Sequence, residues 1–182
     1  MVLGCSTTAA TEENYMASVN DSTPSPTSAN IAATSTDKLN DLIETLKDGQ
    51  LGFAAAAEDA RSADIKQVLT KYARQREDFA RQLQRVVAHH GGNPQKSGSL
   101  SGALHRGWIN MKATVATRDD LAVLKECERG EDLEVSAYQK ALEEGDLGCA
   151  ASLISKQYAD LKAAHDEIRG LRDRYETDSA AG

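Results

Sequence analysis

Apolar residues recur every three or four positions along four long segments of the chain. The segments cover about residues 37–61, 64–90, 118–144 and 147–175. This spacing predicts amphipathic helices whose apolar stripes face a common core. Gly91-Gly92-Asn93-Pro94 marks the end of the second helix, because glycine and proline interrupt helical structure there.

The lengths of the connections predict the topology. Links of a few residues join the first helix to the second and the third to the fourth, so each pair forms an antiparallel hairpin. About 27 residues separate the two hairpins, and within them residues 99–115 predict a short helix. We therefore expect an all-α protein, a ferritin-like four-helix bundle in which a long crossover with its own short helix joins two antiparallel hairpins.

The two ends of the chain differ from its middle. Residues 1–36 hold 13 Ser or Thr and few large apolar side chains. Such a segment cannot bury enough apolar surface to offset its conformational entropy, so we predict a disordered Ser/Thr-rich tail. The predicted bundle covers residues 37–176, and residues 177–182 form a predicted frayed C-terminus.

Composition and charge narrow the classes of function. Aromatic residues make up 4% of the chain, and Pro94 is the only proline after residue 36, which argues against a β-sandwich or barrel. The chain has 28 acidic and 21 basic residues and thus a net charge of −7, which argues against nucleic acid as a partner. No apolar stretch is long enough for a transmembrane segment.

Three cysteines at distant positions match neither a disulfide framework nor a zinc motif, so we expect a cytoplasmic protein. Val2-Leu3-Gly4-Cys5 leaves an alternative open, because it is similar to the end of a lipoprotein signal. The basic and apolar regions that normally precede such an end are absent. The alternative is a protein lipid-anchored through Cys5, unless the chain starts at Met16.

Polar side chains interrupt the apolar stripes near the middle of the helices. Arg76 occupies a stripe position on the second helix, and Gln157 does so on the fourth. Glu128 and Glu131 lie three residues apart on the predicted buried face of the third helix, so their side chains are neighbours. We predict a buried polar layer of Arg76, Glu128, Glu131 and Gln157.

The first interpretation of this layer is an internal ion pair. A buried carboxylate without a counter-charge is very costly, so Arg76 between Glu128 and Glu131 supplies the charge that the two acids need. A guanidinium at the centre also repels a divalent cation. This interpretation predicts no cofactor and no metal.

The alternative interpretation is a metal site. Ferritin-like di-iron proteins take one carboxylate from each of two helices and Glu-x-x-His from each of the other two. Here the last helix keeps the histidine, but Lys162 replaces its glutamate partner. The alternative is thus a metal-binding oxidase or iron-handling protein that holds iron or another divalent metal. Its candidate ligands are Glu128, Glu131, His165 and Asp48.

Three motifs carry a family resemblance. They are Lys47-Asp48-Gly49-Gln50-Leu51-Gly52-Phe53, Leu104-His105-Arg106-Gly107-Trp108 and Cys127-Glu128-Arg129-Gly130-Glu131-Asp132. Over about residues 37–173 the chain resembles an uncharacterised bacterial family of ferritin-like four-helix bundles, a domain of unknown function. The resemblance implies the fold and carries no activity. More distantly, Gly130-Glu131 with Tyr138 is similar to a rubrerythrin metal-ligand helix, with Glu131 at the ligand position.

The remaining candidates concern contacts rather than chemistry. His105, Arg106 and Trp108 predict docking of the crossover onto the bundle, and a homo-oligomer contact at Trp108 is the alternative. Cys127 lies among acidic residues, which predicts a packed and unreactive thiol. No phosphate loop or nucleophile motif is present. The sequence favours a structural, interaction or stress-related module over an enzyme, and it identifies no small-molecule substrate.

Overall fold

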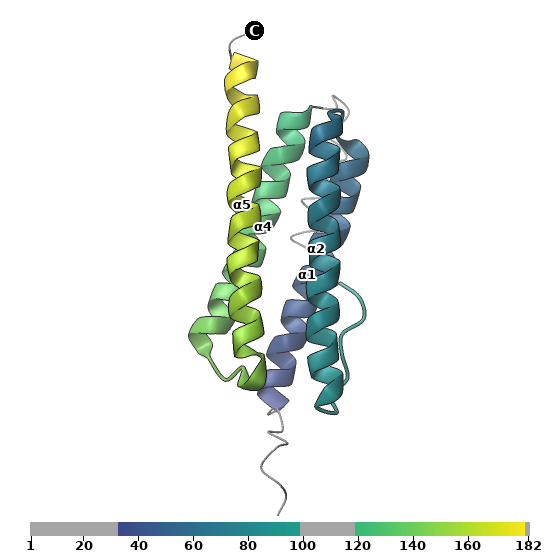
Figure 1. Ribbon diagram of the computed structural model, residues 1–182, viewed down its shortest axis with the longest axis vertical. Coiled ribbons are helices and arrows are strands. Elements are labelled where there is room, and N and C mark those ends of the chain that lie inside the picture. The colour runs from purple at the N-terminus through teal and green to yellow at the C-terminus, as the bar shows by residue number, and fades with distance from the viewer. Residues whose placement is uncertain (1–32, 99–118, 181–182) are drawn as a thin grey trace, which may run out of the picture.

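The computed structural model describes residues 33–98 and 119–180 of the chain (Figure 1). All regular structure in these two ranges is helical: α1 Ala33–Asp59, α2 Ala63–His89, α4 Asp120–Glu144, the 3-10 turn η2 Gly148–Ala150 and α5 Ala151–Ala180. The protein is an all-α helical bundle, which confirms the class that the apolar spacing predicted. The predicted crossover helix, His105, Arg106, Trp108 and Cys5 lie outside the described residues.

The first and last helices of the chain, α1 and α5, are longer than the apolar pattern indicated. Helix α1 begins at Ala33 rather than near residue 37, within the segment predicted as tail. Its first turn contacts the turn between α4 and α5, because Ser35 Oγ donates a hydrogen bond to the Asp146 carbonyl oxygen at 2.5 Å. Helix α5 continues to Ala180, past the predicted frayed end at residue 177, and Figure 1 shows it reaching beyond its neighbours.

Contacts at the helix ends fix the directions of the helices. The backbone amides of Arg61 and Ser62, just after α1, donate hydrogen bonds to the Asp120 carboxylate at the start of α4, at 2.7 and 3.0 Å. Ser35 and Asp146 join the opposite ends, so α1 and α4 are antiparallel. Helices α2 and α4 begin at the same end and run in parallel. This parallel course agrees with two hairpins joined by a long connection.

The core consists of two apolar clusters that lie one above the other along the bundle. Members of the first include Leu39, Leu42, Ile43, Leu46, Phe79, Leu83, Tyr138, Ile154 and Leu161. Members of the second include Phe53, Ala56, Ile65, Leu69, Tyr72, Val123, Leu124, Ala164 and Ile168. On α1, α2 and α4 the buried residues between the two clusters are polar or charged: Asp48, Arg76, Glu131 and Glu134. The polar level at mid-height is therefore the place where the core departs from ordinary bundle packing.

Candidate functional site

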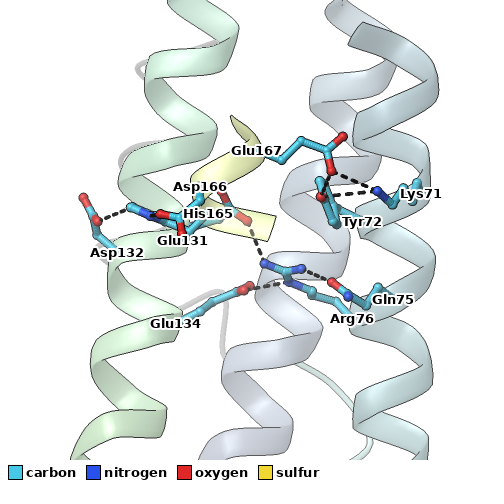
Figure 2. A network of polar contacts seen from close by, with 10 residues as sticks. All are labelled: Lys71, Tyr72, Gln75, Arg76, Glu131, Asp132, Glu134, His165, Asp166 and Glu167. Atoms are coloured by element: carbon cyan, nitrogen blue, oxygen red, sulfur yellow. Dashed lines mark hydrogen bonds and ion pairs between the residues drawn. The ribbon is translucent and has the colours of Figure 1, made fainter. Parts of the chain in front are cut away.

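Arg76 of α2 lies at the centre of the polar level and is completely buried. Its Nη2 donates a hydrogen bond to Glu131 Oε1 and its Nε donates one to Glu134 Oε2, both at 2.8 Å (Figure 2). The two acids lie one turn apart on α4, so both are within reach of one guanidinium. We call Arg76, Glu131 and Glu134 the ion-pair layer.

Two aromatic rings also contact the guanidinium. The Arg76 Cζ atom lies 4.9 Å from the centroid of Phe53 on α1 and 5.5 Å from that of Tyr72 on α2. Arg76 Nη1 donates a further hydrogen bond to Gln75 Oε1 (Figure 2). A planar, weakly hydrated guanidinium suits such surroundings better than an ammonium group does, because it stacks on rings while its edge binds carboxylates.

Gly49 allows α1 to pack directly against the ion-pair layer. A Cβ atom at this position would lie 1.5 Å from Glu134 Oε1 and 3.4 Å from Arg76 Cγ. Glu134 is held by Arg76, so it cannot move away without breaking that contact. The absence of a side chain at residue 49 is therefore a structural requirement of the ion pair.

The layer carries one positive charge and two acidic groups. Burial disfavours the charge of Arg76, but Glu134 and Glu131 outweigh this effect, so the pKa of the guanidinium is raised. Burial raises the pKa of Glu131 to about 8, although Arg76 opposes the shift. Burial also raises the pKa of Glu134 against the opposing effect of Arg76. One guanidinium is thus insufficient to keep both acids in their ordinary range.

A small cavity lies beside the layer, between α1 and α4. Its volume is about 40 Å³, and its lining includes Asp48, Gly52, Cys127, Glu131 and Glu134. Cys127 is buried, and burial together with the nearby Glu131 raises the pKa of its thiol. A thiol that keeps its proton is a poor nucleophile. These surroundings agree with the prediction of a packed and unreactive thiol at Cys127.

Three of the four residues predicted for the polar layer are buried, and one of these lies apart from the ion pair. Arg76 and Glu131 contact each other directly. Gln157 of α5 is buried as well, but it accepts a hydrogen bond from the Tyr138 hydroxyl at 2.7 Å and donates one to Gln82 Oε1 at 3.1 Å. It therefore belongs to a neighbouring polar contact within the first apolar cluster.

The structure pairs Arg76 with Glu134 where the sequence analysis expected Glu128. Glu128 is only partly buried, and its Oε1 lies 3.0 Å from Arg172 Nη2 and 3.5 Å from Arg169 Nε, both on α5. The physical reason is the angular position of residues on α4. Residues 127, 131, 134 and 138 form the buried stripe, and Glu128 is rotated out of it toward α5.

The residues of the metal-site alternative do not form one cluster. Asp48 and Glu131 line the same cavity. Glu128 is paired with arginines of α5, and His165 Nε2 lies 2.9 Å from Asp132 Oδ1 (Figure 2). Within residues 33–98 and 119–180, no three His, Cys, Asp or Glu side chains are arranged to hold a metal ion. These contacts favour the ion pair as the interpretation of the polar level.

Residues 34–144, which cover α1, α2 and α4, match the family described as "Domain of unknown function (DUF2383)". The chain belongs to this family. The match confirms the resemblance to an uncharacterised family, while the similarity to rubrerythrin stays a prediction. No curated protein matches the chain. The ion-pair layer of this DUF2383 protein lies entirely within the matched residues.

The requirement for glycine at residue 49 is testable with a matched pair of variants. Gly52 lies one turn further along α1, and a Cβ atom there would meet nothing within 4 Å. Gly52→Ala should stabilise the DUF2383 protein by about 0.5–1 kcal/mol through helix propensity. Gly49→Ala should destabilise it by about 1–3 kcal/mol, because the methyl group displaces Glu134. Urea unfolding of both variants measures the difference, and equal effects would contradict the packing described here.

The cost of an unpaired buried charge gives a second prediction. Arg76→Met leaves Glu131 and Glu134 buried without their counter-charge and should destabilise the protein by about 3–5 kcal/mol. Replacing all three residues, with leucine at both acidic positions, should recover most of that loss because no buried charge is left. Urea unfolding again supplies the measurement. Arg81→Met, which removes a half-exposed arginine five residues further along α2, is the control and should change stability by less than about 0.5 kcal/mol.

Proposed function

We propose that this protein is a non-catalytic helical bundle in which a buried Arg/Glu ion pair takes the place of a metal centre. We further propose that it serves as a structural, interaction or stress-related module. The observation that carries the proposal is Arg76, a fully buried guanidinium bound by Glu131 and Glu134 at 2.8 Å each.

The position of this guanidinium is incompatible with a divalent cation between the same two acids. Arg76 keeps its charge at any physiological pH, so it repels a cation at close range. The oxygens that face it already accept its hydrogen bonds. The two acids that the bundle brings together in its core are therefore engaged with Arg76.

The spacing of the two acids supports a ferritin-like origin for the layer. Glu131 and Glu134 are separated by two residues, as are the glutamate and histidine of the Glu-x-x-His motif in di-iron bundles. The parallel course of α2 and α4, which requires a long crossover, is also typical of that architecture. We infer a degenerate di-iron site in which Arg76 of α2 supplies the positive charge and Lys162 of α5 replaces the glutamate partner of His165.

The contacts of the other candidate ligands favour this proposal over a metal-binding oxidase or iron-handling protein. Glu128 forms ion pairs with arginines of α5, and His165 pairs with the exposed Asp132. A metal site built on Glu128, Glu131 and His165 would have to break these contacts and displace Arg76.

The location and assembly of the protein are further proposals. None of the helices in the described parts of the chain combines the length and apolar character needed to cross a membrane. We propose a cytoplasmic location on the basis of composition and cysteine usage, with acylation at Cys5 as the alternative. We also propose the crossover residues around Trp108 as the candidate surface for a homo-oligomer contact.

Metal content tests the proposal. The full-length protein, purified from cells grown with added iron, should contain far less than one iron, manganese or zinc ion per chain by plasma mass spectrometry. The variant Glu131→Gln should give the same result, because the proposed layer holds no metal to lose. About two ions per chain, lost on Glu131→Gln, would contradict the proposal and favour the di-iron alternative.

A further inference from the structure

Among the described residues, Glu131 has a buried carboxylate oxygen without a hydrogen bond. Its Oε1 accepts from Arg76 Nη2 at 2.8 Å. Its Oε2 is buried and has no hydrogen-bond partner among the residues that the structure describes. A buried carboxylate oxygen without a donor is strongly unfavourable, so this atom requires an explanation beyond the ion pair.

The charges around Glu131 give the first part of that explanation. Titratable and charged groups of three helices lie around it: Asp48 of α1, Tyr72 and Arg76 of α2, and Glu126, Cys127, Asp132 and Glu134 of α4. From α5, His165 contacts the neighbouring Asp132. Arg76 is the cation that contacts Glu131 directly, and it is shared with Glu134. Two ionised acids on one guanidinium would leave the ion-pair layer with one excess negative charge inside the core.

The cavity gives the second part. It is lined by Glu131 and has a volume of about 40 Å³. A buried water molecule needs roughly 10–15 Å³ and two to four polar partners. The cavity therefore has room for a water molecule that accepts a hydrogen bond from Glu131, with Asp48 and Glu126 among the polar groups around it.

We propose that Oε2 of Glu131 is a proton-binding site of the folded protein, which donates its proton into the cavity between α1 and α4. The bound proton removes the excess negative charge and turns the unpaired oxygen into a donor. Oε1 remains an acceptor for Arg76, so the ion-pair layer keeps its geometry. We place the proton on Glu131 because its Oε2 is buried and has no hydrogen-bond partner among the described residues.

The pKa of Glu131 agrees with this geometry. Burial raises it from an ordinary value of 4.5 to about 8, and the nearby Glu134 and Asp132 contribute to the rise against the opposing effect of Arg76. At neutral pH the folded protein thus holds a proton that the unfolded chain has released. The stabilisation is complete below about pH 4.5, declines as the pH rises, and is lost above about pH 8.

The proton linkage of unfolding tests the proposal. Urea unfolding of the full-length protein in chelator-treated buffer is measured between about pH 5 and pH 8, together with Glu131→Gln and Glu128→Gln. Relative to Glu131→Gln, the unfolding equilibrium constant of the wild type should rise by up to tenfold for each pH unit, about 1.4 kcal/mol. Glu128→Gln, the same change three residues earlier on α4, should keep the wild-type slope. Equal slopes for the wild type and Glu131→Gln would overturn the proposal.

A second measurement uses the wild type alone, in case Glu131→Gln does not fold. Infrared spectra should contain the carbonyl band of a buried, protonated carboxylic acid at about pH 6, and this band should disappear above about pH 9. Absence of the band would overturn the proposal. The proposal would also be overturned if the stability depended on the sodium or potassium concentration instead of on pH, because a cation rather than a proton would then occupy the site at Glu131.

The inference rests on the proposed structural role of the ion-pair layer, and the two can fail separately. Stoichiometric metal in the purified protein contradicts the proposed function whatever the pH dependence is. A missing pH dependence in metal-free protein contradicts the proton site and leaves the ion pair unaffected.

Discussion

A guanidinium removed from water must be paired by groups that stay fixed around it, and this constraint governs the centre of the bundle. Arg76 is completely buried, and its two carboxylate partners come from one face of α4. The desolvation cost of such a group is so large that loss of a single partner is more damaging than loss of the whole set. The ion pair is therefore better understood as a requirement on the surrounding residues than as a source of stability.

Several otherwise unrelated features follow from that requirement. Residue 49 must lack a side chain because Glu134 lies against the backbone of α1. The apolar core is divided into two clusters because Asp48, Arg76, Glu131 and Glu134 occupy the buried positions between them. The imbalance of one cation and two acids gives Glu131 its perturbed acidity. The DUF2383 bundle thus has a polar centre that restricts both its packing and its protonation.

Much of this arrangement could be predicted from the sequence. The apolar spacing gave the helices, and Arg76 on a stripe identified the buried charge. The second acid that pairs with Arg76 was harder to predict. Glu128 and Glu134 lie three residues to either side of Glu131, so a small error in helical phase exchanges them. The role of Gly49 depends on the distance between two helices, which no pattern within one helix contains. The same holds for Gln157, whose partners lie on α4 and α2.

The most direct test of the buried ion pair is hydrogen exchange at the guanidinium itself. The Nε–H of Arg76, assigned by loss of its NMR signal in Arg76→Lys, should exchange only through global unfolding, at a rate matching the most protected backbone amides. The side chain of Arg81, five residues further along α2 and about half exposed, supplies the reference for fast exchange. An Arg76 Nε–H that exchanges as fast as that of Arg81 would contradict the buried ion pair.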